Sequence, residues 1–401
     1  MKLFYLIVIQ LLMVSCNSAY KDSPLKKTVN KINLFEAFKK RGEIKLSDFI
    51  EKLEYVPLET TKNVVIGKIR QLFVTEKFFV IHDWFRCYLF DRKGKFVRYI
   101  GKNGKGPGEY SAIRCIDVDE QSGYIYINVN TKRYFLKYNF KGVFLGAIGK
   151  DLDISGVAFI DTCNYIYNVE NYYGNSKYKY VTQDINNEII HKFPNCIRFN
   201  YQASNYGTVL SRNNCSFFVR NDFSIYAKPF FNDTIFKVIN RNKIIPCYIF
   251  DCQKKRIPIS LLGDNPDFFA ENPKYLVPSD IVLNNKYVFV ELEYQKKKYG
   301  GFYSVNTHKT YVLNPVIEKL YGFYNDFDGG LPFWPVTNYK QDKLAGFVYA
   351  YQLKDYIKNN LHNKEILNTT NQQKLIKMTN QINKDSNPIL VIATIKKECS
   401  L

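Results

Sequence analysis

Short apolar stretches, separated by polar turn residues, recur through most of the chain. Residues 79–101 read as a strand, a loop, a second strand, a tight turn and a third strand, and residues 124–149 repeat this order. Gly94 of the first copy aligns with Gly142 of the second, 48 residues later. Glycine at this position supplies the positive φ that a tight hairpin requires. The pattern therefore predicts antiparallel strand units of nearly constant length.

Weaker copies of the unit follow. Each pairs two apolar segments: Tyr165–Val169 with Tyr178–Val181, Phe217–Arg220 with Asp233–Val238, Tyr287–Glu291 with Gly301–Val305, and Tyr321–Tyr324 with Leu344–Tyr349. Antiparallel units with a period near ~50 residues are typical of β-propeller blades. The 308 residues from 43 to 350 accommodate six such units. We therefore predict an all-β fold, a six-bladed β-propeller over residues 43–350.

Two segments far apart in the sequence are expected to close the ring, because an open sheet edge favours aggregation. They are residues 53–58 and residues 388–393. The second is almost wholly apolar, which predicts burial on both faces. Residues 351–401 are predicted to form a short helical segment and this closing strand, packed on or closing the propeller. Apolar positions there recur at helical spacing: Leu353, Tyr356, Ile357 and Leu361, then Leu375, Thr379 and Ile382.

Composition agrees with the strand pattern and adds a strong positive charge. The chain holds 32 Tyr and 31 Phe but only 3 Met, a mixture that suits sheets better than helices. Its formal net charge is +20, which favours acidic partners or simply maintains solubility. The basic runs are short and far apart, and none carries a nucleic-acid-binding signature. We therefore expect no nucleic acid partner.

The N-terminal segment predicts export. Lys2 precedes an apolar stretch from Leu3 to Val14, which would rise about 18 Å as a helix, too short for a bilayer core of about 30 Å. Residues 1–15 are therefore predicted to be a signal peptide. The end of this segment, through Ser15 and Cys16, resembles the lipobox of bacterial lipoproteins. The resemblance implies lipidation of Cys16, with membrane association through the lipid anchor.

The next residues are predicted to connect the anchor to the folded domain. Residues 16–42 are polar and rich in Lys and Asn, as in a tether. Leu34, Phe35 and Phe38 can form one turn of a docking helix within it. Position 17 is Asn rather than the aspartate associated with inner-membrane retention. We therefore expect the protein to be anchored in the cell envelope at the outer membrane, on either its periplasmic or its surface face.

A glycine-rich segment carries a family resemblance. Residues 100–110 read IGKNGKGPGEY, supported by residues 90–96, 326–335 and 385–390. The chain resembles the 6-bladed β-propeller lipoproteins of Gram-negative gut-type bacteria, distant relatives of NHL-repeat propellers. The resemblance implies the fold and export, and it brings no activity with it.

The same segment suggests a phosphate-binding loop, because exposed backbone N–H groups can hold an anion. Pro107 stands where a P-loop has its lysine, and proline has no N–H to donate. We therefore expect a structural connection between blades. Its residues are Gly104, Gly106, Pro107, Gly108, Glu109 and Tyr110.

A second segment supplies the candidate ligand-binding residues. Asp326 and Asp328 flank Phe327, and Phe333 and Trp334 follow soon after. Exposed aromatic rings beside carboxylates often hold sugars, but core packing is the explanation that we favour for Phe333 and Trp334. Asp326 and Asp328 resemble part of a calcium loop, but the regular further oxygen ligands are missing. We therefore expect no metal.

Other reactive residues form no recognisable catalytic motif. The four His show neither HxH nor HExxH spacing, and the chain has no GxSxG sequence. Eight Cys remain besides Cys16, of which Cys247 and Cys252 are the closest pair and could form a disulfide. The catalytic residues stay unknown, and no cofactor is expected.

These observations leave three functions open. The first is a non-enzymatic binding module for a glycan, a peptide or an envelope protein partner. The second is a polysaccharide-active enzyme, a lyase or glycoside hydrolase, with its site in the central channel. The third is a structural scaffold subunit. Export, anchoring and the propeller scaffold favour the first.

Overall fold

The computed structural model describes residues 29–129, 134–149, 154–171, 173–200, 218–221, 224–229, 232–262, 274–317, 320–360 and 366–397. The predicted signal peptide and Cys16 lie outside these residues. Most elements in the described part are strands, gathered in many small sheets, which confirms the all-β class. In the same part, no helix combines the length and the apolarity needed to cross a membrane.

Four sheets are each built from one continuous stretch of chain, with neighbouring strands antiparallel. The first contains β3 (Gln71–Val74), β4 (Phe78–His82), β5 (Cys87–Asp91) and β6 (Phe96–Tyr99). The second contains β9 (Ile113–Asp119), β10 (Tyr124–Val129), β11 (Phe135–Asn139) and β12 (Phe144–Ile148). The third contains β13 (Ile154–Asp161), β14 (Asn164–Val169), β15 (Tyr178–Asp184) and β16 (Ile189–Pro194). The fifth contains β21 (Val277–Leu283), β22 (Tyr287–Tyr294), β23 (Lys297–Ser304) and β24 (Thr310–Val312).

The fourth and the closing sheet recruit strands from distant parts of the chain. The fourth contains β17 (Phe218–Asn221), β18 (Ser224–Ala227), β19 (Thr234–Asn240) and β20 (Lys243–Phe250), and β1 (Asn30–Ile32) joins β20 in parallel. The closing sheet contains β27 (Thr337–Tyr339), β28 (Lys343–Val348), β29 (Ile389–Ile395) and β2 (Ile50–Pro57). All seven residues of β29 are buried, as its apolar sequence predicts.

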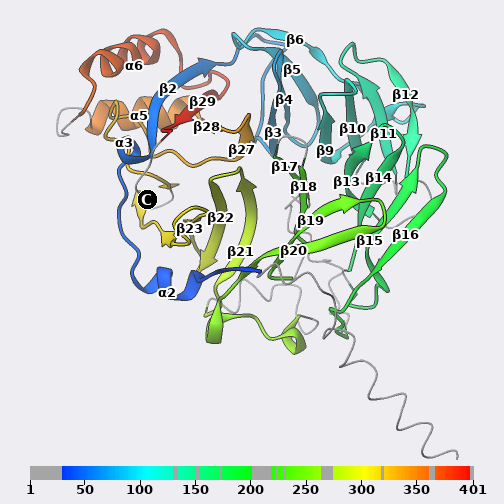
Figure 1. Cartoon of the computed structure of the whole chain (residues 1–401). Coiled ribbons are helices and arrows are strands. Elements are labelled where there is room, and N and C mark those ends of the chain that lie inside the picture. The colour runs from blue at the N-terminus through cyan, green and yellow to red at the C-terminus, as the bar shows by residue number, and fades with distance from the viewer. Residues whose placement is uncertain are drawn as a thin grey trace, which may run out of the picture.

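The sheets are arranged around a common centre (Figure 1). The first strand of each sheet contacts the first strand of the next, in the order β3, β9, β13, β17, β21 and β27, and β27 contacts β3 again. These six strands therefore form an inner ring. Clusters of buried apolar side chains fill the spaces between neighbouring sheets, so the core is divided among the seams of a propeller-like fold.

The repeated turn found in the sequence has the same structure in the first two sheets. Gly94 has a φ of +82° and Gly142 has a φ of +77°. The Asp91 side chain accepts hydrogen bonds from the Lys93 and Lys95 backbone, and the Asn139 side chain accepts one from Val143. The turn residues therefore fix both hairpins in the predicted way.

For three of the four weaker units, those of the third, fourth and fifth sheets, the structure confirms that the two paired segments belong to one sheet. The pairing of Tyr321–Tyr324 with Leu344–Tyr349 is wrong. β26 (Leu320–Tyr321) pairs only with β25 (Pro315–Ile317), and Gly322, with a φ of +144°, ends the strand. The place beside β28 belongs to β29, and β2 lies next to β29, which confirms the two predicted closing segments.

Helices cover parts of the ring (Figure 1). They are α2 (Leu34–Lys39), α3 (Leu46–Phe49), α5 (Ala350–Asn360) and α6 (Thr369–Gln381), with single 3-10 turns at Gln253–Lys255 and Ile259–Leu261. The short strands β7 (Lys102–Asn103) and β8 (Glu109–Tyr110) pair in parallel. The expected helical segment before the final strand is present as α5 and α6.

The predicted tether becomes part of the fold earlier than residue 42. Asn30 already pairs with β20, and Ile32, Leu34 and Phe38 are buried in the apolar cluster between the fourth and fifth sheets. Apolar side chains spaced within this polar segment give it the hydrophobic contact that a free tether lacks.

The possible disulfide between Cys247 and Cys252 is absent from the structure. Cys247 lies in the extended strand β20, which continues to Phe250 and carries the chain about 10 Å away from Cys247. Cys252 is buried in the cluster between the fourth and fifth sheets, where burial raises the pKa of its thiol.

Candidate functional site

A cavity of about 1450 Å³ occupies the centre of the ring. Residues of all six inner strands line it, together with parts of β22 and β23 and the segment from Trp334 to Lys340. This volume exceeds the ~300–1,000 Å³ of an ordinary small-ligand site. Because it lies at the meeting point of the inner strands, this cavity is the candidate functional site.

The inner strand β9 divides its side chains between two environments. Ile116 and Val118 pack in the apolar cluster between the first and second sheets. Asp117 and Asp119 alternate with them and therefore point to the opposite side, and both line the cavity. The period of two along this strand thus produces a pair of carboxylates on the cavity wall.

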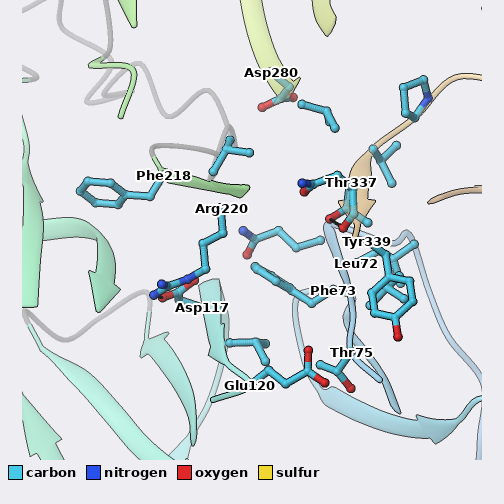
Figure 2. Close-up of a pocket in the computed structure, with 18 of the residues that line it drawn as sticks. Leu72, Phe73, Thr75, Asp117, Glu120, Phe218, Arg220, Asp280, Thr337 and Tyr339 are labelled. Carbon is cyan, nitrogen blue, oxygen red and sulfur yellow. Dashed lines mark hydrogen bonds and ion pairs between the residues drawn. The ribbon is translucent and has the colours of Figure 1, made fainter. Parts of the chain in front are cut away.

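An ion pair joins two inner strands across the cavity wall. Arg220 of β17 lies with Nη2 3.2 Å from Oδ2 of Asp117, and its Nη1 donates to the Phe159 carbonyl at 3.1 Å. Figure 2 shows Arg220 reaching from β17 toward Asp117. Burial raises the pKa of Asp117, and the Arg220 guanidinium opposes that shift. Arg220 of the fourth sheet therefore contacts both the second sheet, at Asp117, and the third sheet, at the Phe159 carbonyl.

A second charged group lies on the fifth sheet. Glu291 of β22 accepts from Lys298 Nζ at 2.6 Å and from the hydroxyl of Tyr321. Ser279 of β21 also donates to Glu291 Oε1 at 3.3 Å. Burial and the Glu291 carboxylate together raise the pKa of Tyr321. This part of the cavity wall is therefore fixed by its own hydrogen bonds.

Acidic side chains outnumber basic ones around the cavity. Among the described residues the lining contains eight carboxylates, namely Glu76, Asp117, Asp119, Glu120, Asp161, Asp280, Glu291 and Glu293, against five cations, namely Lys68, Arg70, Arg220, Lys298 and Lys340. Two of the cations form the ion pairs described above. The cavity is thus acidic in a chain whose formal net charge is +20.

Aromatic side chains form much of the remaining wall. They come from five of the six sheets and from the segment before β27, and they are Phe73, Phe159, Phe218, Phe289, Trp334, Tyr339 and Phe347. Figure 2 shows Phe73 at the centre of the view, between the first sheet and Arg220. Rings of this kind offer apolar faces to a sugar and electron-rich faces to a cation.

The structure separates the four candidate ligand-binding residues. Trp334 lines the cavity and packs against Phe289 and Phe323. Phe333 is 3% exposed and lies in the core cluster beside the closing sheet. Asp326 accepts from the Ser47 backbone and hydroxyl, which connects it to α3. Of the four, only Trp334 is placed to touch a ligand in the cavity.

Asp328 is buried and hydrogen-bonded within the fold, away from the cavity. It is 1% exposed, and its Oδ1 accepts from Tyr55, from Asn325 and from the Gly330 backbone. Burial raises its pKa, and these donors oppose the shift. Because Tyr55 belongs to β2, Asp328 connects the segment before β27 with the outer strand of the closing sheet.

The glycine-rich segment lies outside the central cavity. Glu109 Oε2 accepts from the Gly106 backbone at 2.9 Å. Tyr110 is buried, and its hydroxyl donates to the Ile100 carbonyl while the Cys87 backbone donates to it. Tyr138 donates to the Gly108 carbonyl at 2.6 Å. These contacts agree with the expected structural connection between the first and second sheets.

Sequence reasoning missed most of the cavity wall. The repeat is recognisable in the three outer strands of each unit, and the inner strands β3 and β9 lie before those segments. The sequence of β9 held a usable signal, because Asp117 and Asp119 alternate with apolar residues in a strand too buried to be a solvent face. A carboxylate at every second position of a buried strand indicates a polar cavity.

One solved structure shares the arrangement, and two others are more distantly similar. The exported protein BF0058 from Bacteroides fragilis NCTC 9343 is 20% identical, with a TM-score of 0.71 over 92% of this chain and 100% of that one. A member of the DUF4221 family from Bacteroides vulgatus ATCC 8482 is 13% identical, with a TM-score of 0.48 over 89% and 99% of the two chains. A streptogramin B lyase is 12% identical, with a TM-score of 0.40 over 73% and 79%. At such identities the first similarity concerns the fold alone.

The sequence comparisons give a family and no activity. No curated protein matches the chain. Residues 29–394 match the family described as "Domain of unknown function (DUF4934)". That range begins with the first described residue and takes in the inner ring, the central cavity and nearly all of the closing sheet. The chain therefore belongs to the DUF4934 family.

Proposed function

We propose that the protein is a lipid-anchored binding module of the cell envelope, a six-bladed β-propeller related to NHL-type propellers that holds its ligand in the central cavity. The observation that carries the proposal is the cavity itself, about 1450 Å³ in volume and lined from all six sheets. Polar groups already fixed by ion pairs, such as Arg220 and Glu291, can orient a ligand without first being ordered. The ligand is a glycan, a peptide or a segment of an envelope protein.

The test compares ligand binding by the wild-type protein with binding by a variant whose cavity is partly filled. The purified protein is titrated calorimetrically with a panel of envelope glycan fragments and peptides. Thr337, which lines the cavity from β27, is replaced in Thr337→Trp to fill part of it. We expect at least one ligand whose affinity falls tenfold or more in this variant. Thr370→Trp, at an exposed position of α6, is the matched control and should change affinity less than twofold.

Two results would contradict the proposal. The first is a ligand set that binds Thr337→Trp as well as the wild-type protein, because the site would then lie elsewhere. The second is turnover of a polysaccharide, which would favour the alternative, a lyase or glycoside hydrolase. That alternative draws support from the eight carboxylates of the described lining, since glycoside hydrolysis uses a pair of carboxyl groups.

The anchor needs a separate experiment. Export is consistent with the exported relative BF0058, and lipidation of Cys16 at the outer membrane is proposed from the lipobox alone. Cys16→Ala should abolish incorporation of labelled palmitate and move the protein from the membrane fraction to the soluble fraction. A variant that still fractionates with the outer membrane would contradict the anchor and leave the binding site untouched.

A further inference from the structure

The charge of the cavity is opposite to the charge of the chain. Eight carboxylates and five cations line it, whereas the whole chain carries a formal charge of +20. The excess of negative charge is also unevenly placed along the inner strands, and this uneven placement is the basis of the inference.

Four of these eight carboxylates lie where the inner strands β3, β9 and β13 end. Glu76 follows β3, Asp119 ends β9 and Glu120 follows it, and Asp161 ends β13. The Glu76 backbone donates to Glu120, which places the ends of β3 and β9 side by side. Arg220 contacts both Asp117 and the Phe159 carbonyl, two residues before Asp119 and Asp161, so the ends of β9 and β13 lie at one level.

We call this end the acidic mouth and define it by Glu76, Asp119, Glu120 and Asp161. Two lining cations lie near the same end: Arg220, which is paired with Asp117, and Lys340, which follows β27. At the opposite end Lys68, Arg70 and Lys298 face Asp280, Glu291 and Glu293, an equal number of each sign. The net negative charge of the cavity is therefore located at the acidic mouth.

One member of the acidic mouth has an uncompensated atom. Asp119 is 5% exposed, its Oδ1 accepts from the Ser122 backbone, and its Oδ2 has no hydrogen-bond partner among the described residues. Lys137 is attracted to it without forming an ion pair. A buried carboxylate oxygen without a partner is costly, and a cation brought to the mouth lowers that cost through its field.

The carboxylates are spread rather than gathered. Among the described residues no three acidic, His or Cys side chains come close enough to hold one metal ion. Separate carboxylates instead match separate cationic groups on one ligand. Phe73 and Phe218 line the wall near the same strands and can receive ammonium or guanidinium groups on their faces.

We propose that the acidic mouth binds a lysine- or arginine-containing peptide segment through its ammonium or guanidinium groups. The inference rests on the proposed function, since it names the ligand class of the same cavity. The basic exterior of the protein repels such a ligand everywhere else, so the mouth is also the place to which long-range forces direct it.

The experiment compares two peptides and two variants of the whole protein. The peptides are hexalysine and its fully Nε-acetylated form, which keeps the length and loses the charge. The mouth variant combines Glu76→Gln, Glu120→Gln and Asp161→Asn. The control variant combines Glu51→Gln, Glu188→Gln and Asp385→Asn, which are exposed, lie outside the lining and change the net charge equally.

We expect hexalysine to bind the wild-type protein at least tenfold more tightly than the acetylated peptide. The mouth variant should lose about tenfold or more in affinity, because several exposed charge pairs contribute modestly and together. The control variant should change affinity less than twofold. Thermal unfolding of both variants checks that each is folded. Added salt should weaken the binding of hexalysine to the wild-type protein.

Two outcomes would overturn the inference. One is hexalysine binding no tighter than the acetylated peptide, and the other is an equal loss in the mouth and control variants. If either occurs while Thr337→Trp still weakens an uncharged ligand of the panel, the ligand class is wrong and the binding module stands. If Thr337→Trp weakens nothing in the panel and hexalysine does not bind, both proposals fail.

Discussion

The second sheet and the closing sheet both have four strands, but they draw those strands from the chain in different ways: one from a single stretch, the other from distant segments. The second sheet uses one stretch, from Ile113 to Ile148, and each strand pairs with the next one in sequence. The closing sheet takes β27 and β28, then β29 after two helices, and finally β2 from near the start of the fold. Local turns specify the first kind of sheet, and only contacts between distant segments specify the second.

The difference shows where the stability of the ring is concentrated. The outer strand β12 is paired with β11 alone in its sheet, whereas β29 lies between β28 and β2 and so holds two distant parts of the chain together. Leu390 and Ile392 of β29 also pack into the cluster shared with the first sheet. We therefore expect equal changes in the two sheets to have unequal consequences.

The largest difference is expected from one leucine in each sheet. Leu390 in β29 is fully buried, and Leu145 in β12 is 46% exposed. Leu390→Ala should lower the free energy of unfolding by about 2–5 kcal/mol, because it removes buried contacts and leaves a cavity. Leu145→Ala should change it by less than about 0.5 kcal/mol. Urea unfolding followed by circular dichroism measures both, and similar losses would refute the contrast.

A smaller difference is expected from the repeated glycines. A Cβ at Gly94 would lie 2.3 Å from the Pro57 carbonyl oxygen at the end of β2, whereas at Gly142 the nearest atom is the Tyr99 carbonyl oxygen at 3.3 Å. Both positions have positive φ, which costs alanine about 1–2 kcal/mol. Gly94→Ala should lower the free energy of unfolding by about 1–3 kcal/mol more than Gly142→Ala does, because β2 of the closing sheet must shift to make room for the methyl group. Equal urea midpoints for the two variants would show that only the positive φ of the turn, and not the contact with Pro57, determines the loss of stability.

The smallest effect concerns pH at the edge of the closing sheet. Burial raises the pKa of Asp328, so the folded protein binds this proton more tightly than the unfolded chain does. The free energy of unfolding should therefore fall as the pH rises from about 4 through the raised pKa. The fall is about 1.4 kcal/mol for every tenfold difference in proton affinity between the folded and the unfolded chain. Asp328→Asn should remove that slope in thermal unfolding between pH 4 and 7.

The control for this slope is Asp91→Asn. It removes one carboxylate from the turn of the first sheet and places there the residue that the second sheet has at Asn139. The slope should persist in this variant. A slope that survives in Asp328→Asn as well would mean that other groups cause it.

The fold could be predicted where neighbours in sequence are neighbours in space. The turns at Gly94 and Gly142 identified the outer strands of two sheets, and the apolar run of β29 identified a doubly buried strand. The prediction failed at Tyr321–Tyr324, where aromatic residues look like a strand but Gly322 interrupts it. It also missed how early the chain joins the fold, because three apolar side chains before residue 39 are a weak signal in a polar segment.

The site could not be predicted in the same way. Asp117 and Arg220 are 103 residues apart and meet only because the ring brings their strands together. Of the residues chosen from the sequence, Asp326 and Asp328 accept hydrogen bonds from Ser47 and Tyr55, and Phe333 is packed in the core. Of the four candidates, Trp334 is the one that lines the cavity, and its role in binding a ligand stays a prediction. The chemistry of a ring centre is divided among strands that no local pattern connects.

The parallel pair of β1 with β20 has a mechanical consequence. A pull on the chain from the side of its first residues reaches Asn30–Ile32 before it reaches β2 in the closing sheet. The three residue pairs of β1 with β20, together with the buried side chains of α2, would take up that load first. A force applied at that end would therefore be resisted by these contacts before it reached the strand that closes the ring.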